Sequence, residues 1–265
     1  MISKSKLKEL AAYRLQKNCD EEAVFVVEGP KMAAEAMASG FAVRTVCATS
    51  EWINENLKRK KEKDATQDAS ANFSFFISHF SFSVYEVSQS ELERLSNFKT
   101  PNQVWMLVER RTESGERRTE NGLTLALDRI QDPGNMGTLM RTADWFGVRH
   151  IVCSRDTVSC YNPKVVQASM GAIFRTRVDY VDLPEWLASC GLPIYGASLQ
   201  GKPLSSFLFP LTSPSVLLIG NESRGISPEA MASVTHPVLI PNLGGTAESL
   251  NAAVAAGILM HALTE

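Results

Sequence analysis

The segment from residue 216 to residue 261 constrains the fold more than any other part of this chain. Two short apolar runs, at residues 216–219 and 237–241, alternate with two polar loops that contain glycine, and an alanine-rich run follows. Short apolar runs bounded by glycine and proline favour buried parallel strands. Ser249 stands where a helix cap is expected, directly before the alanine-rich run. Because polar loops that leave adjacent strand ends mark the ligand edge of an open α/β sheet, we expect a binding site here.

The bulk composition is that of an ordinary soluble globular protein with room for two domains. The chain has 265 residues, of which 44% are hydrophobic and 21% are charged, and its formal net charge is -2. This charge gives no global basic field, so a nucleic-acid site would need a local basic patch. No apolar run approaches the roughly 20 residues that cross a bilayer. The N-terminus also lacks a signal-peptide core, so we expect a cytoplasmic protein without membrane association.

The cysteines and histidines give no sign of a metal centre or a disulfide framework. The five cysteines are widely spaced and include no C-x-x-C pair, and the four histidines show no ligand spacing. Reduced thiols and no bound metal are therefore expected.

The first 108 residues predict a small α/β domain because strand-like and helix-like patterns alternate along them. The first helix is predicted from Leu7, Leu10, Ala11 and Leu15, which recur at helical spacing. Ser88, three residues before Glu91, predicts a capping box for a later helix. The other expected elements are strands over residues 23–28, 43–48, 73–77 and 84–87 and a helix over residues 32–37.

Two basic segments of this domain are candidates for contact with RNA. Residues 1–17 carry a local excess of four positive charges, and residues 58–63 form a basic run that leads into a polar stretch over 64–72. A solvated helix face explains the first segment equally well, and a charge run such as the second is more usually a solvated loop, so both interpretations stay open. Residues 109–122 contain no apolar side chain and predict a solvated linker, which places a second domain at residues 123–265.

The second domain opens with a predicted strand over residues 123–128 and a turn at Pro133. Asn135 is expected to cap the helix that follows the turn. Arg141, six residues further on, lies near the same helix face. An asparagine and an arginine beside a helix N-terminus suit an anionic ligand such as a phosphodiester. Alone, the pattern is equally typical of a capped helix with a surface arginine.

Three sequence blocks, taken in order, resemble the motifs of the SpoU (TrmH) family of RNA ribose 2'-O-methyltransferases, within the SPOUT superfamily. The resemblance covers residues 123–263, and residues 1–105 resemble the ribosomal-protein-like substrate-binding domain often fused ahead of it. The blocks are Asn135-x-Gly137-x-x-x-Arg141, Gly220-Asn221-Glu222, and Ile240-Pro241 leading to Ser249-Leu250-Asn251.

The resemblance implies an α/β fold with two parts. A small α/β RNA-binding domain is followed by a Rossmann-like, parallel-sheet domain whose C-terminal chain forms a deep trefoil knot. Such threading is rare and does not follow from local sequence patterns. The resemblance also implies S-adenosyl-L-methionine bound in the knot and a homodimer. No G-x-G-x-x-G follows any expected strand, which argues against a dinucleotide-type methyltransferase.

The resemblance also assigns site residues, and two sets are carried over. It implies that Arg141 acts as the general base at the target ribose. A guanidinium stays protonated in proteins, so Arg141 suits gripping a phosphate and stabilising a developing alkoxide better than removing a proton. The catalytic neighbourhood implied is Asn135, Arg141, Glu222, Ser249 and Asn251. The donor contacts implied, largely through the backbone, are Leu199, Gly220, Ile240 and Leu250.

In this assignment the polar residues support Arg141 and the RNA. Asn135, Ser249 and Asn251 would orient the RNA and Arg141, while Glu222 would hold Arg141 or interact with the positive donor. Ser223 stands where the family commonly has glycine, and Asn242 stands where it often has methionine. These departures touch the donor loops, whereas every polar catalytic position is filled as the family requires.

The sequence therefore predicts an S-adenosyl-L-methionine-dependent methyltransferase of a ribose 2'-hydroxyl, and 23S-type rRNA is the favoured substrate. Two alternatives stay open. One is a tRNA 2'-O-methyltransferase, and the other is a catalytically inactive knot protein that binds RNA.

Overall fold

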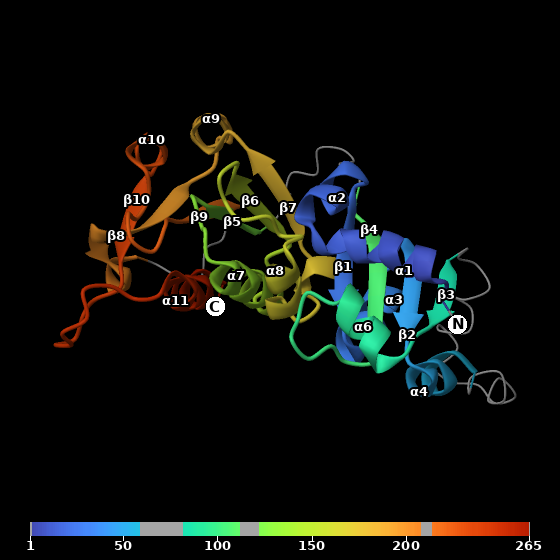
Figure 1. Cartoon of the computed structure of the whole chain (residues 1–265). Helices are drawn as coiled ribbons and strands as arrows, with labels where there is room; N and C mark the ends of the chain where they lie inside the picture. The colour runs from blue at the N-terminus through green and yellow to red at the C-terminus, as the bar shows by residue number, and fades with distance from the viewer. Residues whose placement is uncertain (1, 59–81, 112–121, 208–213, 265) are drawn as a thin grey trace, which may run out of the picture. The chain divides into compact units, whose positions relative to one another are not determined.

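A computed structural model describes residues 2–58, 82–111, 122–207 and 214–264 (Figure 1). By their contacts the residues form two compact units, each built on one β-sheet. The first unit joins residues 1–114 and 161–167, and the second joins residues 115–160 and 168–265. The basic run after residue 58, the polar stretch, the strand expected at residues 73–77 and most of the expected linker lie outside the described residues. The domain boundaries expected from the sequence stay a prediction.

The first unit is a mixed four-stranded sheet in the order β1-β4-β2-β3. β4 runs antiparallel to both of its neighbours, whereas β2 and β3 are parallel. The strands are β1 (Val24–Glu28), β2 (Val43–Ala48), β3 (Ser83–Glu86) and β4 (Val104–Glu109). The strands expected at residues 43–48 and 84–87 are therefore confirmed.

Helices α1 and α6 cover one face of this sheet and pack on each other. Leu7 and Leu10 of α1 meet Leu92 and Leu95 of α6 in one apolar cluster with the strands. The capping box expected at Ser88 is confirmed, because its hydroxyl accepts a hydrogen bond from the Glu91 backbone N–H at 3.3 Å. The helices and helical turns of this unit are α1 (Lys4–Ala11), η1 (Ala12–Arg14), α2 (Gln16–Glu21), α3 (Pro30–Ala38), α4 (Ser50–Ile53), η2 (Asn54–Lys58) and α6 (Gln89–Leu95).

The expected first helix is confirmed, but it ends earlier than its apolar spacing predicts. A 3-10 turn follows Ala11, and Leu15 adopts an extended backbone with 66% of its surface exposed. The tighter turn rotates Leu15 away from the buried face that Leu7 and Leu10 share. The placement of Leu15 on that face was wrong.

The second unit is a six-stranded sheet in which every pair is parallel, in the order β10-β8-β9-β5-β6-β7. Its inner strands are buried on both sides, as continuous apolar runs in a parallel sheet should be. The strands are β5 (Leu123–Leu127), β6 (His150–Ser154), β7 (Arg177–Val181), β8 (Ile194–Pro203), β9 (Ser215–Ile219) and β10 (His236–Leu239).

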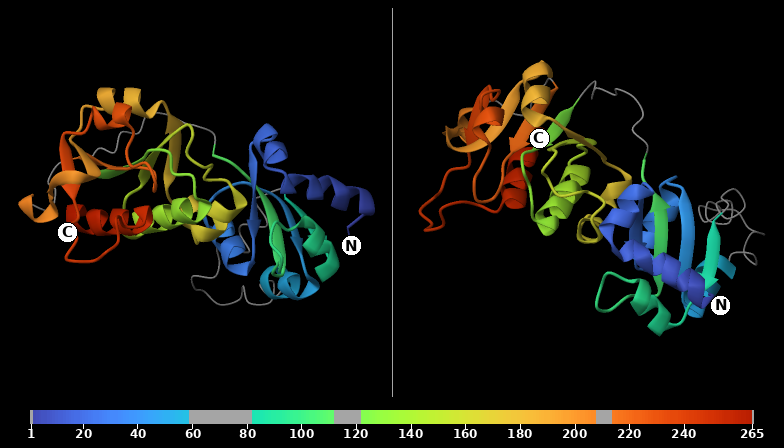
Figure 2. Two further views of the ribbon diagram at one scale, coloured as in Figure 1. Left: turned by 60° about the vertical axis from the view of Figure 1, so that its left-hand side comes forward. Right: turned by 45° about the horizontal axis from the view of Figure 1, so that its top comes forward.

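Helices cover both faces of this sheet (Figures 1 and 2). α7 and α11 lie side by side on one face, and α9 and α10 lie on the other. Ala126, Val216 and Leu218 point toward α9 and α10 in one apolar cluster. The helices and turns of this unit are α7 (Pro133–Trp145), η4 (Ala172–Phe174), α9 (Leu183–Ser189), η5 (Leu204–Ser206), α10 (Pro228–Met231) and α11 (Ala252–Thr264). Helix α8 (Pro163–Ala168) belongs, except for its last residue, to the first unit.

The strand order reverses its direction between β5 and β9. The chain leaves β5 for β6 and β7 on one side, and it returns through β8 and β9 on the other side. The carboxyl ends of β5 and β9 therefore flank a topological switch point, where open parallel sheets bind their ligands. Whether the C-terminal chain threads a loop to form a knot stays a prediction.

Two further properties of the chain bear on its expected location and chemistry. All five cysteines are free thiols, and Cys190 is the one that is not fully buried. Among the helices of the described residues, none is both long enough and apolar enough to span a membrane.

Candidate active site

Asp132 caps α7, so the expectation that Asn135 does so was wrong. The carboxylate of Asp132 accepts a hydrogen bond from the Asn135 backbone N–H at 2.7 Å, and Pro133 occupies the first helical position. Asn135 consequently lies within the first turn of the helix. Its side chain is not used by the cap and is available for tertiary contacts.

Asn251 caps α11, so the expectation that Ser249 does so was also wrong. The side-chain oxygen of Asn251 accepts hydrogen bonds from the backbone N–H groups of Ala253 at 2.9 Å and Val254 at 3.3 Å. Ser249 lies in the exposed loop before the helix and makes no hydrogen bond with any described residue. The helix begins later than its alanine-rich composition suggests, at Ala252.

A chain of side-chain hydrogen bonds joins the three sequence blocks. The Asn251 amide donates to Asn135 Oδ1 at 2.9 Å, and the Asn135 amide donates to Glu222 Oε1 at 2.6 Å. The cap fixes which side of the Asn251 amide is oxygen, and this in turn fixes the orientation of Asn135. The cap of α11 by Asn251 therefore orients Asn135 so that its amide N–H group, and not its oxygen, faces Glu222.

Arg141 and Ser249 are not part of this chain of contacts. Arg141 lies on the exposed side of α7 and makes no hydrogen bond or ion pair with any residue that the structure describes. The contact between Glu222 and Arg141, one of the two expected from the sequence, is not formed. Arg141 is thus available to a ligand, and its role stays a prediction.

The loop after β9 is tied to the end of β5 by residues that sequence reasoning missed. The Asn221 amide donates to the Arg129 carbonyl at 2.8 Å, and the Ser227 N–H donates to the buried Asp128 carboxylate at 2.6 Å. Gly220 must lack a side chain, because a Cβ there would lie 2.2 Å from the carbonyl carbon of Gly225. The signal in the sequence was a charged residue, Asp128, closing an apolar strand.

Three of the four residues expected to contact the donor lie on or directly after neighbouring strands, and the fourth, Leu250, lies in the loop before α11. Gly220 follows β9 and Ile240 follows β10, and Leu199 lies in β8 between them, where the pairing with β10 shifts register. Leu199 is 71% exposed and Leu250 is 47% exposed. Exposed leucines beside loop backbone fit a flat apolar ring with polar edges, such as adenine. These residues therefore suit the implied donor, although their contacts with it stay predictions.

A parallel sheet covered by helices on both faces, with a polar site at its switch point, defines an α/β enzyme that binds ligands at the carboxyl edge of its strands. The family model of the SpoU rRNA Methylase family matches residues 122–261, and the chain belongs to this family. A second model, the MRM3-like substrate binding domain, matches residues 4–105. The suspected family and the α/β fold class are thereby confirmed.

Similar proteins cover nearly the whole chain. The 23S rRNA (guanosine(2553)-2'-O)-methyltransferase RlmP of Bacillus subtilis is 28% identical over 97% of this chain and 95% of its own. A putative RNA methyltransferase of the TrmH family from Porphyromonas gingivalis is 34% identical with a TM-score of 0.80, over 98% of this chain and 97% of its own. An AdoMet-bound rRNA methyltransferase from Sinorhizobium meliloti is 25% identical with a TM-score of 0.81, over 98% of this chain and 94% of its own.

Proposed function

We propose that the protein methylates a ribose 2'-hydroxyl of 23S-type rRNA with S-adenosyl-L-methionine as donor. The observation that carries the proposal is the chain of hydrogen bonds from Asn251 through Asn135 to Glu222, which gathers all three sequence blocks at the switch point. The Bacillus subtilis relative, matched along nearly its full length, is a methyltransferase of this kind. A cytoplasmic location stays a prediction.

The proposed mechanism follows from what the two reactants lack. Bound S-adenosyl-L-methionine would supply an activated methyl group, whereas a protonated ribose hydroxyl is a poor nucleophile. The protein must therefore align the hydroxyl oxygen and help its proton leave. Glu222 is held through one oxygen by Asn135, so its second oxygen remains for the ribose hydroxyl or the positive donor.

Arg141 is proposed to hold the RNA phosphate at the target nucleotide and to stabilise the alkoxide as it forms. Its exposed guanidinium, which has no partner among the residues that the structure describes, supports this role, because a planar fork of N–H donors matches the oxygens of a phosphodiester. Ser249, in the neighbouring exposed loop, is proposed to contact the RNA directly.

A homodimer is proposed from an exposed apolar surface on two helices that pack together. Trp145 of α7 is 84% exposed, and Val254 and Ile258 of α11 are 52% and 38% exposed. Val254 and Ile258 stand four residues apart and so share one helix face. Clustered exposed apolar side chains favour contact with a second protein surface, and a second copy is the usual partner.

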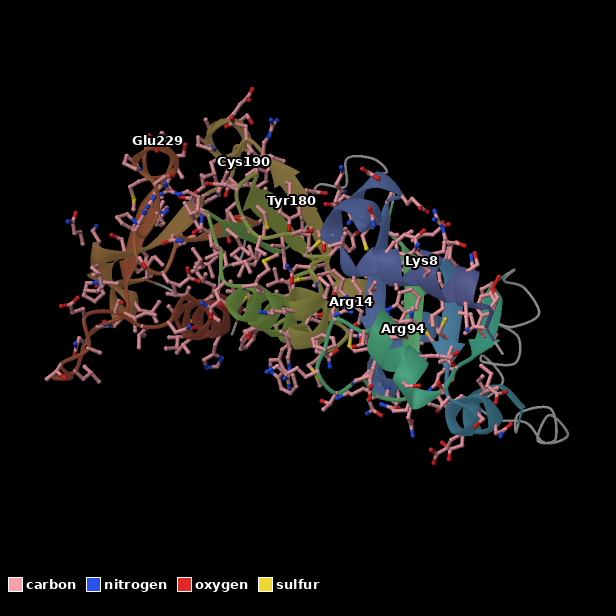
Figure 3. All side chains as sticks on the ribbon, viewed as in Figure 1. Lys8, Arg14, Arg94, Tyr180, Cys190 and Glu229 are labelled. Atoms are coloured by element: carbon pink, nitrogen blue, oxygen red, sulfur yellow. The ribbon has the colours of Figure 1, made fainter. Side chains whose placement is uncertain are left out.

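The first unit is proposed to bind RNA through a basic surface on α1, the turn after it and α6. Lys8, Arg14 and Arg94, labelled in Figure 3, are exposed and form no ion pair with a described residue. α1 and α6 pack on each other, so the segments that carry these positive charges are neighbours. Unpaired lysines and arginines on one face are the usual electrostatic footprint of nucleic-acid binding.

The proposal is tested by incubating the purified protein with tritiated methyl donor and separated rRNA and tRNA. We expect label in the 23S rRNA fraction as an alkali-resistant dinucleotide, the product of a methylated ribose. Label in tRNA alone would favour the tRNA alternative. RNA binding without label in either pool would leave the inactive binding protein as the better description.

A further inference from the structure

We propose that Arg129 and Arg224 form an anion site for the RNA backbone, directly beside Glu222. The inference rests on the proposed function and adds a second grip on the substrate, separate from Arg141. It concerns two residues outside the three sequence blocks that define the family motifs.

The site is a polar cavity at the switch point between β5 and β9. It has a volume of about 460 Å³, and its lining includes Arg129, Asn221, Glu222 and Arg224. Arg129 enters the cavity from the end of β5, and the other three belong to the loop after β9. A ligand in this cavity would therefore lie against the carboxylate that Asn135 orients.

Arg129 is held in a backbone conformation that residues other than glycine rarely adopt. Its φ angle is 57°, which costs a residue with a Cβ about 1–2 kcal/mol. Its N–H donates to Ser154 Oγ at 2.8 Å, and its carbonyl accepts from the Asn221 amide at 2.8 Å. Strain that neighbours enforce from both sides is typical of functional sites, and here it fixes the direction in which the side chain leaves the strand.

The guanidinium of Arg129 is only partly satisfied by the protein. Its Nε is buried without a hydrogen-bond partner among the described residues, and it lies 3.4 Å from Asp128 Oδ1. The other oxygen of Asp128 accepts the Ser227 N–H at 2.6 Å. The side chain keeps 27% of its surface exposed where it lines the cavity, so its remaining N–H groups can reach a ligand.

The cavity holds two guanidinium groups and two carboxylates, so an anion would be bound by the N–H donors of the guanidinium groups and not by a net positive charge. The two carboxylates there are engaged, Asp132 by the cap of α7 and Glu222 by Asn135. The side chain of Arg224 is exposed and has no partner among the described residues. Two guanidinium groups beside a bound ribose match the oxygens of the adjoining phosphodiester.

The test uses Arg129→Gly, Arg129→Lys and Arg224→Ala in the full-length protein, with a 23S rRNA transcript and tritiated donor. Glycine accepts the positive φ, and the two backbone hydrogen bonds of residue 129 do not depend on its side chain. The matched control is Arg149→Ala. Arg149 is an exposed arginine directly before β6, at the amino end of the strand and away from the carboxyl edge where the cavity lies. KM for RNA, kcat, donor affinity and the salt dependence of RNA binding are measured for each variant.

We expect Arg129→Gly and Arg224→Ala each to raise KM for RNA about ten-fold, with kcat changed by less than about three-fold and donor affinity unchanged. The slope of log affinity against log salt should fall by about 0.7 per lost contact. Arg129→Lys should recover part of the loss, and Arg149→Ala should match the wild type.

Wild-type values of RNA KM and salt slope in both variants would overturn the inference and leave the proposed function intact. Weaker donor binding with unchanged RNA affinity would also overturn it, because the cavity would then hold the carboxylate of the donor. If the wild type transfers no methyl group to RNA, the proposed function fails, while the salt slopes still decide whether these arginines contact RNA.

Discussion

At the scale of single residues, Asn251 performs two tasks with the two ends of one amide. Its side-chain oxygen accepts hydrogen bonds from the first free backbone N–H groups of α11, and its side-chain nitrogen donates to Asn135. Because each amide has one accepting and one donating end, the direction of the whole chain of hydrogen bonds is set by the helix cap. The cap thereby determines that Glu222 meets a donor.

Asn251→Asp separates these two tasks. Aspartate caps helices as well as asparagine does, so we expect α11 to persist and the melting temperature to change by no more than about 3 °C. The new carboxylate would turn the Asn135 amide round and set its oxygen against Glu222, so kcat should fall about ten- to a hundred-fold. Thermal melting and methyl transfer are measured together. Full activity in a stable variant would contradict the orienting role.

Arg141 is the second residue whose role can be isolated. Arg141→Ala should reduce methyl transfer by at least about a hundred-fold, because the proposed contacts of this side chain are with RNA. The fold should persist, because the side chain has no hydrogen-bond or ion-pair partner among the described residues. Donor binding, measured by calorimetry, should stay close to that of the wild type. Turnover within a few-fold of the wild type would refute the role.

In the first unit, Glu28 at the end of β1 is buried, which raises the pKa of its carboxyl even though Ser96 and the Asn97 N–H donate to it. The folded state therefore holds this proton to a higher pH than the unfolded state, whose glutamate pKa is about 4.3. Stability from this group is present below that pH and is lost as the pH rises through the folded pKa. Replacing the ionisable carboxyl of Glu28 should remove this dependence of stability on pH.

Glu28→Gln is therefore expected to be more stable than the wild type at pH 8, with the advantage shrinking as the pH is lowered toward 4. Urea denaturation across this range measures the difference. A Glu93→Gln variant, which changes an exposed carboxylate of α6, is the control. A difference between Glu28→Gln and wild type that is independent of pH would contradict the burial argument.

At the scale of elements, local patterns predicted the strands well and the helix starts less well. β2 and the segment around β5 follow from apolar runs bounded by turn residues. The starts of α7 and α11 were misplaced because each has two possible caps within three residues. At α7 the side chain of Asn135 contacts Glu222 and Asp132 is the cap, whereas at α11 Asn251 both caps the helix and contacts Asn135. These long-range contacts are not contained in the local pattern. Strand order, and hence the cavity, depends on long-range pairing that no local pattern contains.

Two glycines of the second unit should respond oppositely to alanine. In Gly220→Ala the new Cβ would collide with the backbone of Gly225, 2.2 Å away. We therefore expect the free energy of unfolding to fall by about 2 kcal/mol or more, and methyl transfer to be lost. Gly257 lies within α11, and the nearest atom to a new Cβ there is Thr142 Cγ2 of α7 at 3.6 Å, an ordinary contact. Gly257→Ala is therefore expected to raise the stability by about 0.5–1 kcal/mol. Chemical denaturation measures both. If the two substitutions changed the free energy of unfolding equally, the loop that contains Gly225 would have moved aside to accept the new Cβ.

At the scale of the whole molecule, the family assignment spans both units, since separate models match residues 4–105 and 122–261. The exposed residues Trp145, Val254 and Ile258 are the least expected of a protein that acts as a monomer, because their apolar surface would remain in water. Their place on two packed helices makes this face the proposed dimer contact.

Trp145→Asp combined with Ile258→Asp should convert the protein to a monomer, because each new charge would be buried without a partner at the contact. Light scattering after gel filtration gives the mass. Leu15→Asp, at an apolar residue of the first unit that is 66% exposed, is the control and should leave the mass unchanged. A monomeric wild type, or a dimer that survives both charges, would refute the proposed contact.

The hydrogen bond between Asn135 and Asn251 joins positions 116 residues apart in the chain. During synthesis, the residues around Asn135 leave the ribosome long before Asn251 is added. A nascent chain therefore carries two of the three polar partners without the one that orients them. Methyl transfer should therefore begin only when α11 has emerged from the ribosome and folded. A chain released before that point would be inert toward RNA.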